Sequence, residues 1–454
     1  MSISRRVALQ VGCSSFAGLI LPQLAGGTPL PARERSGITA KSVILVYLPG
    51  APSQIDTFDM KPNAPAEIRG SFTPIATAVA GTQICEHLPL LARRTDKYTI
   101  VRSMELTTLA GAHEHATPLM LGGIDQRPPG TTLVNTRNDW PCYSAGLQHA
   151  RRDENDLPSG IHVPHFITNG PMGYAGQNAG FLGASYDPLQ LEADPNRPDF
   201  RFAGSQLTAG LTVTRLAMRR SLLSTLDRQR RALEKAASRA GYSAQRHRAF
   251  RLLMSGRLVQ AFDLNQEDRR LRDKYGRHTW GQSLLLARRL IQSGIPLVQV
   301  NLGPAGIWDT HKDNFTGLKN RLLPPFDAGL SALLDDLHTT GAIEETLVVV
   351  ISEFGRTPKI GGFVKTILSD PTGREHWGPC FHALFAGGGV TPGRIIGASD
   401  QHAAYCQTTP FHPSDVGATI YTALGVDPQT EIRDQLDRPY HLNSGSLMTP
   451  LFDA

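Results

Sequence analysis

Several short runs of consecutive apolar residues, many of them β-branched, recur along the chain and predict buried strands. They lie at Ser42–Leu48, Tyr98–Met104, Pro296–Leu302, Leu347–Ile351 and His382–Ala386. Continuous apolar runs of this length are typical of strands that are covered on both faces. Amphipathic patterns predict helices at Leu322–Thr339 and Ser414–Leu424, with Ser414 as the N-cap of the second. The alternation predicts an α/β fold with a mostly parallel central sheet between helical layers.

The stretch from residue 207 to residue 295 differs from this pattern, because it is rich in Leu, Ala and Arg and has a helical period throughout. We interpret it as a helical insertion in a single domain that spans residues 40–454. Its arginines are interpreted as a solvated helical face rather than as a nucleic-acid-binding surface. The glycine-rich residues 170–188 carry no phosphate-binding pattern and are interpreted as a surface loop near a site.

The N-terminus has the pattern of an export signal. Ser4, Arg5 and Arg6 precede a moderately apolar stretch that is rich in Ala, Gly, Leu and Ser. A twin arginine before such a stretch indicates a Tat-type signal peptide, here within residues 1–32. No later segment has the roughly 18 apolar residues that a spanning helix needs. We therefore expect an exported protein, periplasmic or on the cell surface, that meets the Tat export machinery and has no transmembrane segment in its mature form.

The overall composition adds little to this picture. The 454 residues are 40% hydrophobic and 19% charged, with a net charge of +6. This modest excess suits a small-molecule or glycan substrate that is anionic, and it does not indicate nucleic acid. The five cysteines show no CxxC pair, which argues against a cysteine zinc site or a disulfide framework. With Cys13 in the leader, four cysteines remain, and one disulfide of unassigned pairing stays open.

Polar residues follow the ends of several predicted strands. In a parallel sheet these ends meet at one edge, where ligands bind. Aspartate, glutamate and histidine together form an oxygen and nitrogen ligand set that suits divalent metals. For Glu353 and Arg356 alone, a salt-bridged turn is an equal alternative. The residues considered for this site are Asp56, His113, His115, Asp309, His311, Glu353, Arg356, Arg374 and His376.

Motifs spread over most of the chain resemble the DUF1501 family of exported bacterial proteins, which is similar to the alkaline phosphatase and sulfatase superfamily. These motifs include GAPSQIDTFD at Gly50–Asp59, WDTHKDNF at Trp308–Phe315, SEFGRTP at Ser352–Pro358 and REHW at Arg374–Trp377. The resemblance implies an alkaline-phosphatase-like αβα sandwich with one or two divalent metal ions. The ligands it implies are Asp56, Asp309, His311, Glu353 and His376.

The resemblance also bears on the catalytic residues. HEHATPLMLGG resembles the nucleophile helix of sulfatases and places His113 at the nucleophile position, with Thr117 as the nearest hydroxyl. Histidine can act as a nucleophile, a base or a metal ligand, and the sequence leaves these roles open. Phe354 stands where the superfamily has a ligand histidine.

These features together predict a metal-dependent hydrolase of phosphate or sulfate esters. Arg356, Arg374 and His115 are the expected groups for binding the anion. Zinc, manganese and calcium are not distinguished. The alternative is a catalytically degenerate member that binds anionic glycans or cell-surface material, which is favoured by Phe354 and by the absence of a hydroxyl nucleophile.

Overall fold

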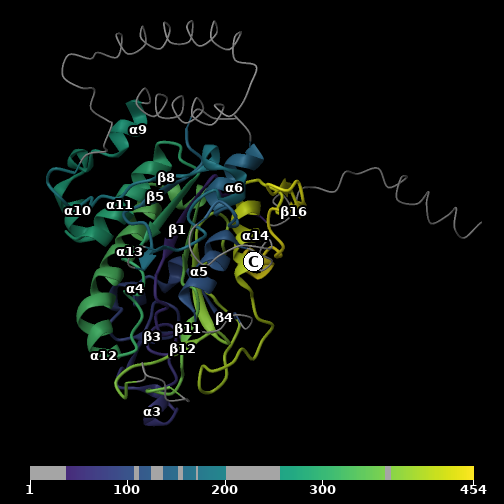
Figure 1. Cartoon of the computed structure of the whole chain (residues 1–454). Helices are drawn as coiled ribbons and strands as arrows, with labels where there is room; N and C mark the ends of the chain where they lie inside the picture. The colour runs from purple at the N-terminus through teal and green to yellow at the C-terminus, as the bar shows by residue number, and fades with distance from the viewer. Residues whose placement is uncertain are drawn as a thin grey trace, which may run out of the picture.

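The fold is organised around an eight-stranded sheet in the order β14-β4-β13-β10-β1-β9-β5-β8 (Figure 1). The computed structural model describes residues 37–106, 112–123, 136–151, 157–169, 172–200, 256–362 and 370–453. The strands of this sheet are β1 (Ser42–Tyr47), β4 (Thr99–Met104), β5 (Ile161–Val163), β8 (Leu189–Gln190), β9 (Leu297–Asn301), β10 (Thr346–Ile351), β13 (Phe381–Ala386) and β14 (Ile395–Ile396).

The sheet is mostly parallel, as predicted. Strand β1 lies between β9 and β10 and runs parallel to both. Strand β13 runs antiparallel to its neighbours β10 and β4, and the other adjacent pairs of this sheet are parallel. The C-terminal ends of β1, β9 and β10 therefore meet at one edge, and the chain leaves each of them toward the candidate site.

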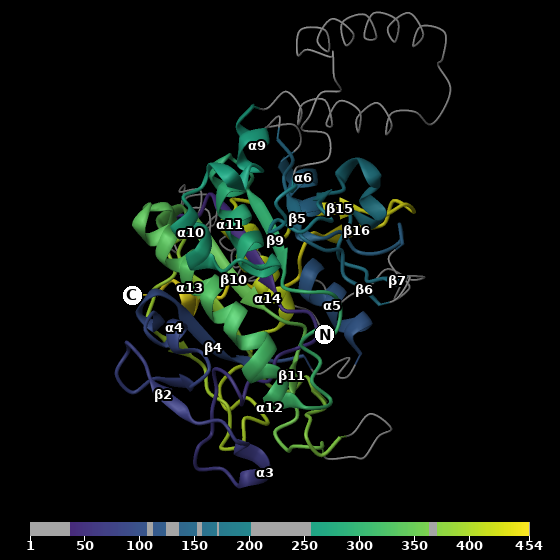
Figure 2. The same ribbon diagram turned by 90° about the vertical axis from the view of Figure 1, so that its left-hand side faces the viewer.

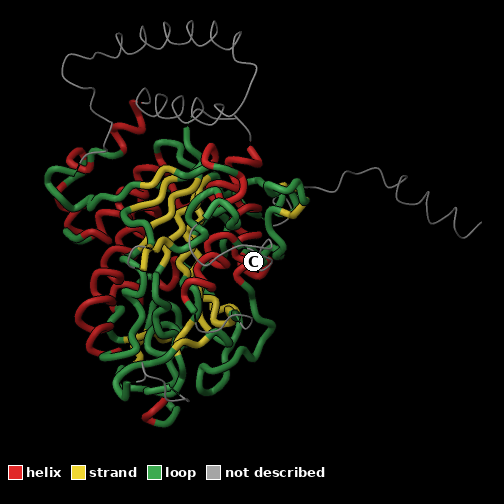
Figure 3. Tube along the Cα trace, viewed as in Figure 1, coloured by secondary structure: helices red, strands yellow, loops and turns green. Residues whose placement is uncertain are grey.

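Helices cover both faces of the sheet, as Figures 2 and 3 show. Successive residues of β1 enter two separate cores: Ile44 packs on one side, whereas Val43 and Tyr47 pack on the other. The first core is completed by α11 (Thr279–Gln292) and α13 (Leu323–Thr339). The second is completed by α5 (His113–Gly122), α6 (Tyr143–Arg151) and α14 (Pro413–Ala423). This two-sided burial explains why the strands are apolar without alternation.

Short elements connect these layers. Four two-stranded ribbons are formed by β2 (Pro74–Ala76) with β3 (Gln83–Cys85), β6 (Thr168–Asn169) with β7 (Met172–Gly173), β11 (Gly355–Arg356) with β12 (His376–Trp377), and β15 (Glu431–Arg433) with β16 (Pro439–His441). The short helices are α3 (Ala66–Arg69), α4 (Pro89–Ala92), α9 (Gly256–Ala261), α10 (Arg269–Tyr275) and α12 (Asn314–Gly317). Single turns are η1 (Thr95–Lys97), η2 (Gly180–Leu182), η3 (Ala184–Tyr186), η4 (Leu264–Gln266), η5 (Leu318–Leu322), η6 (Ala342–Glu345) and η7 (Thr449–Leu451).

The five predicted strands and the helix over residues 322–339 are present to within a residue or two, but the predicted cap of α14 is wrong. Helix α14 begins at Pro413, and His412 is its N-cap. The His412 side chain accepts a hydrogen bond from the Ser414 backbone N–H, and Asp415 accepts one from the His412 N–H. Proline favours the first helical position, so the helix starts one residue before the predicted cap.

Two predictions fall largely outside the described residues. The export signal over residues 1–32 does so entirely, and the proposed insertion does so over residues 201–255. Within the remainder of the proposed insertion, α11 packs on β9 and β1 and forms part of the helical layer. Within the described ranges, no helix has the length and apolar character that a membrane span requires.

Candidate metal centre

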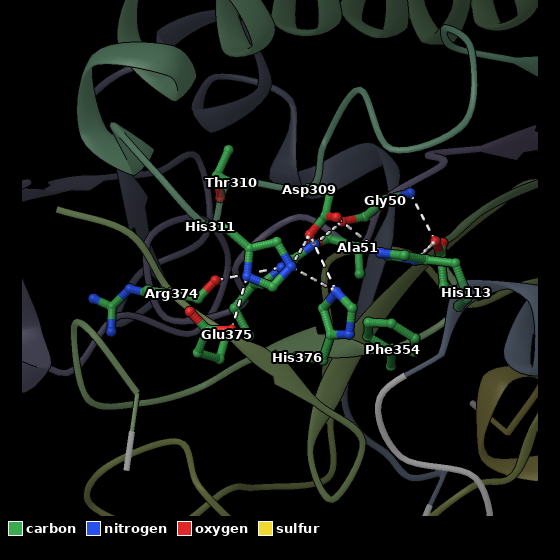
Figure 4. A network of polar contacts seen from close by, with 12 residues as sticks. Gly50, Ala51, His113, Asp309, Thr310, His311, Phe354, Arg374, Glu375 and His376 are labelled. Carbon is green, nitrogen blue, oxygen red and sulfur yellow. Dashed lines mark hydrogen bonds and ion pairs between the residues drawn. The ribbon is translucent and has the colours of Figure 1, made fainter. Parts of the chain in front are cut away.

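Three histidines converge on the carboxylate of Asp309 at the C-terminal edge of the sheet (Figure 4). Asp309 Oδ2 lies 3.2 Å from His113 Nε2. Asp309 Oδ1 lies 3.0 Å from His311 Nε2 and 3.2 Å from His376 Nε2. The two nitrogens His311 Nε2 and His376 Nε2 are 3.0 Å apart. All three imidazoles thus present the same ring atom to one point.

The fold brings these residues together from distant parts of the sequence. Asp309 and His311 lie in the loop that follows β9, and His113 is the first residue of α5. His376 lies on β12, which pairs with β11 directly after β10, so that Arg356 and His376 are opposite each other. The fold thus brings together Asp309, His311, His376 and His113, which strand-end placement and the family resemblance had grouped at one edge.

Carboxylates lie behind two of the three histidines. Glu353 Oε1 is 2.6 Å from His113 Nδ1 and also accepts from the Gly50 N–H at 2.7 Å. Glu353 Oε2 accepts from the Tyr47 hydroxyl at 2.9 Å. Glu375 Oε2 lies 2.8 Å from His311 Nδ1. Carboxylates in this position orient histidine ligands and direct Nε2 toward a metal.

The donor set fits a single divalent ion. The Nε2 atom of His113 is buried and has no hydrogen-bond partner among the described residues, although an Asp309 oxygen is close. Ligand atoms of His113, Asp309 and His376 all lie within 4.8 Å of one another. In a tetrahedral site with metal–ligand bonds of about 2.0–2.1 Å, neighbouring ligand atoms are separated by about 3.3 Å. Asp309 lies 3.2 Å from both His113 Nε2 and His376 Nε2, close to that spacing. His311 Nε2 lies beside this group, 3.0 Å from Asp309 Oδ1 and from His376 Nε2.

Electrostatics favour the same arrangement. Burial opposes ionisation of Asp309, but its contacts with the three histidines and with Arg356 hold its pKa well below the usual range. Burial lowers the pKa of His376, which leaves its imidazole neutral. Burial also disfavours the His113 cation, but Asp309 and Glu353 outweigh it and raise the pKa of His113 to about 9. Binding of a metal at His113 Nε2 would therefore release a proton.

Arg356 is engaged inside the protein and is not an exposed anion clamp. Its side chain is fully buried. Nε donates to the Ala51 carbonyl at 2.8 Å, and Nη1 donates to the Arg374 carbonyl at 3.3 Å. Nη2 contacts the Gly50 carbonyl and pairs with Asp309. Arg356 thus holds Asp309 and the loop after β1 in place.

Asp56 and Arg374 pair with each other rather than with a metal or a ligand. Arg374 Nε donates to Asp56 Oδ2 at 2.6 Å, and Nη2 donates to Oδ1 at 2.8 Å. Asn314 Nδ2 donates to the same Oδ2 at 2.8 Å. Both charged side chains are fully buried. The metal-ligand role predicted for Asp56 and the substrate role predicted for Arg374 are not what this arrangement provides.

The remaining predicted residues surround the cluster without entering it. The buried Thr117 hydroxyl is 3.0 Å from the Tyr47 hydroxyl, which engages it in a hydrogen bond. His115 lies two residues after His113 on α5, a spacing that places it on another side of the helix. The Phe354 ring stacks on His113 with ring centroids 4.9 Å apart and lies equally close to His376. Phe354 thus packs the imidazoles in place.

Sequence reasoning missed Glu375, Tyr47 and Gly50. Glu375 immediately precedes His376, and this adjacency to a predicted ligand was its one visible signal. Gly50 has φ of 111°, and a Cβ at this position would lie 2.6 Å from the Asp309 backbone nitrogen. Only glycine allows the loop after β1 to approach Asp309 so closely.

Comparison with known proteins gives one family and several solved structures. The family model "Protein of unknown function (DUF1501)" matches residues 40–452. No curated protein matches the chain. The solved structures include Ps i-CgsB in complex with k-i-k-neocarrahexaose, with 13% identity, TM-score 0.40, and coverage of 91% of this chain and 76% of that one. The phosphonate monoester hydrolase SpPMH from Silicibacter pomeroyi has 13% identity, TM-score 0.37 and the same coverage.

An alkaline phosphatase from the Antarctic bacterium TAB5 is also similar, with 12% identity, TM-score 0.37, and coverage of 85% of this chain and 99% of that one. At these scores the likenesses assign neither a substrate nor a metal to this chain.

Proposed function

The chain belongs to the DUF1501 family, and we propose that it is an exported metal-dependent hydrolase of phosphate or sulfate esters. One observation carries the proposal: three histidine Nε2 atoms converge on Asp309. A carboxylate stands behind two of these histidines, His113 and His311. Metal sites use a carboxylate behind a histidine in this way to orient the imidazole as a ligand.

The residues that would hold the metal are His113, His311, His376 and Asp309. Three nitrogens and one oxygen suit zinc or manganese better than calcium, which prefers oxygen ligands. A divalent ion bound here supplies Lewis-acid polarisation of an ester oxygen. The side chains of Asp309, His311 and His376 are 21%, 16% and 16% exposed, so one side of the cluster is open to solvent.

The chain's own residues position His113 and hold its proton. The Tyr47 hydroxyl accepts from Thr117 while it donates to Glu353. Burial, and then the charge of Glu353, raise the pKa of Tyr47 well above its ordinary value, so Tyr47 stays a donor. Glu353 in turn accepts from His113 Nδ1, which leaves Nε2 directed at Asp309. This series of hydrogen bonds fixes the His113 ring before any ligand binds.

Export through the Tat route forms part of the proposal and rests on the twin arginines Arg5 and Arg6. A Tat-exported protein crosses the membrane folded, which suits a metal centre that is loaded beforehand. Detection of the mature chain outside the cytoplasm, and its loss when both arginines are replaced by lysine, tests this part separately from catalysis.

A second candidate function is binding of anionic glycans or cell-surface material without turnover. The observation that favours it is the engagement of both predicted anion-binding arginines: Arg356 holds Asp309, and Arg374 holds Asp56. The hydroxyl of Thr117 is likewise turned toward Tyr47. Under this reading the cluster binds a metal that has a structural or ligand-recognition role.

Elemental analysis and activity assays separate the two functions. The purified full chain is measured for bound divalent metal and then assayed on aryl phosphate and aryl sulfate esters with added zinc or manganese. The hydrolase proposal expects one tightly bound ion and turnover, both lost in Asp309→Asn combined with His376→Ala. His402→Ala, outside the cluster, is the matched control. Metal without turnover would favour the binding protein, and absence of stoichiometric metal would refute both versions of the site.

A further inference from the structure

Two of the four cysteines in the described residues lie near the C-terminal end of β4, and one of them, Cys380, directly precedes β13. The Cys380 thiol donates to the Arg102 carbonyl at 3.6 Å. The Cys406 thiol is 3.6 Å from the carbonyls of both Met104 and Pro379. Cys406 therefore touches the residue that directly precedes Cys380, and the two thiols contact carbonyls of the same strand, Arg102 and Met104 of β4.

The geometry points to a disulfide-forming pair, and we propose that Cys380 and Cys406 become cross-linked in an oxidising compartment. Cys380 is fully buried, whereas Cys406 is partly exposed, so an oxidant reaches Cys406 first. The other two cysteines, Cys85 and Cys142, are buried, and burial raises the pKa of each thiol to about 12. The neighbouring Cys406 and burial raise the pKa of the Cys380 thiol as well, so what sets this pair apart is the partly exposed Cys406, which an oxidant can reach.

The oxidation is a thiol–disulfide exchange with a small disulfide such as glutathione disulfide. The Cys406 thiolate attacks one sulfur of that molecule and releases one glutathione. The Cys380 sulfur, after losing its proton, attacks the Cys406 sulfur and releases the second glutathione. Two electrons pass to the glutathione disulfide, and the two thiol protons end on the released glutathiones. In the cell this step requires the export proposed above, because disulfides persist outside the cytoplasm.

The cross-link would fix a loop that supports the candidate metal centre. Cys406 lies in a turn that is closed by two backbone hydrogen bonds. The Asp400 N–H donates to the Tyr405 carbonyl, and the Gln407 N–H donates to the Ala398 carbonyl. Two carbonyls of this turn accept hydrogen bonds from side chains: that of Ala403 from Gln54 Nε2 and that of Ala404 from Trp377 Nε1.

Gln54 also accepts from the Arg356 backbone N–H, and Trp377 neighbours His376 on β12. The turn therefore holds the β11–β12 ribbon, which carries His376 and Arg356, the buried partner of Asp309.

The test is disulfide mapping on the full chain. Protein is incubated with glutathione disulfide, unfolded, alkylated without reduction, digested and analysed by mass spectrometry. The expected product is a single linked peptide pair containing Cys380 and Cys406, with Cys85 and Cys142 alkylated. Thermal unfolding should occur about 3–6 °C higher in the oxidised than in the reduced protein.

Variants make the result specific. Cys406→Ser should leave Cys380 alkylated and remove the difference in melting temperature, whereas Cys142→Ser should keep the linked peptide. The proposal is overturned if Cys380 and Cys406 of the wild-type chain are both alkylated after oxidation, or if Cys380 is linked to another cysteine. Because the wild-type mapping needs neither metal nor substrate, its outcome is independent of the proposed hydrolase activity and of export.

Discussion

Two polar clusters lie at the same edge of the sheet, and they differ in how completely their charges are paired. In the Asp56–Arg374 pair, both carboxylate oxygens accept from the guanidinium and neither side chain is exposed. In the Asp309 cluster, three imidazole nitrogens face one carboxylate, and His113 Nε2 lacks a hydrogen bond. The complete pairing of Asp56 and Arg374 serves the fold, whereas the buried His113 Nε2 without a hydrogen bond, beside two further imidazoles, is the feature expected of a ligand site.

The comparison also shows what position in a sheet can establish. Both clusters follow strand ends, where ligands of α/β proteins bind. Only in the Asp309 cluster do three imidazole Nε2 atoms face one carboxylate. Position at the edge of the sheet thus identifies candidate residues. Whether their polar atoms are already fully hydrogen-bonded distinguishes structural pairs from candidate ligands.

The largest effect is expected from breaking the paired cluster. Asp56→Ala leaves Arg374 buried without its counter-ion, which should lower the free energy of unfolding by about 3–5 kcal/mol. Urea denaturation measures this loss. The content of metal per folded molecule should stay unchanged, because Asp56 is not a ligand in this arrangement. Asp199→Asn, in an exposed pair with Arg197, is the control that should leave the midpoint unaltered. Loss of metal from folded Asp56→Ala protein would contradict the distinction between the clusters.

The opposite result is expected from removing a member of the open cluster. His376→Ala should weaken metal binding by more than about 100-fold, because loss of a ligand costs more affinity than loss of a residue that only orients a ligand, which costs about 10- to 100-fold. Competition with a chromophoric chelator measures the affinity. The metal-free variant should be about as stable as the metal-free wild type, because burial already disfavours the His376 cation. A large loss of stability without a change in affinity would mean that His376 is structural, as Arg374 is.

A third effect depends on pH. In the metal-free protein the pKa of His113 is raised from 6.5 to about 9, so the folded state holds a proton that the unfolded chain releases. The resulting stabilisation is complete below pH 6.5 and is lost as pH rises to 9. The expected loss is roughly 3–4 kcal/mol, at about 1.4 kcal/mol per pKa unit.

Urea unfolding at a series of pH values, with chelator present, tests this expectation. Burial lowers the pKa values of His162 and His382 to about 3, so these two residues destabilise the fold below pH 6.5 and leave the alkaline window unaffected. His113→Gln should remove the alkaline decline, and saturating zinc should reduce it. A decline that persists in His113→Gln would assign it to another group.

Much of this arrangement could be predicted from the sequence. The apolar runs at residues 42–48 and 347–351 specified β1 and β10, because burial on both faces leaves no polar positions. Asp309, His311, His376 and His113 were all expected at one edge, and they meet there. For Asp309 and His311 this follows from the direction of the parallel strands, whereas His113, which opens α5, and His376, on β12, were placed there with the help of the family resemblance.

The roles of individual side chains could not be predicted in the same way. Arg374 contacts Asp56 across more than 300 residues, and nothing local in either motif reveals this pairing. Glu353 was expected to bind metal, but in the structure its two oxygens accept from His113, Gly50 and Tyr47. Glu375 was not predicted. It is adjacent to His376, and only the tertiary structure determines that its side chain also reaches the loop that carries His311. Such roles are set by hydrogen-bond partners that only the folded chain brings together.

The smallest effect should come from the outer carboxylates, and it tests the open cluster most finely. Glu375→Gln keeps the shape of the side chain but removes the charge that faces His311 Nδ1. If Glu375 orients His311 as a ligand, metal affinity should fall by about 10-fold, the lower end of the range for outer-shell partners, because the residue is 14% exposed and water can replace it in part. Glu86→Gln, whose carboxylate accepts from the distant Thr73 N–H, is the matched control. An unchanged affinity in Glu375→Gln, measured beside a lowered affinity in Glu353→Gln, would mean that His113 and not His311 is the supported ligand. The cluster would then bind its metal through His113, Asp309 and His376, the three residues whose ligand atoms already lie within 4.8 Å of one another.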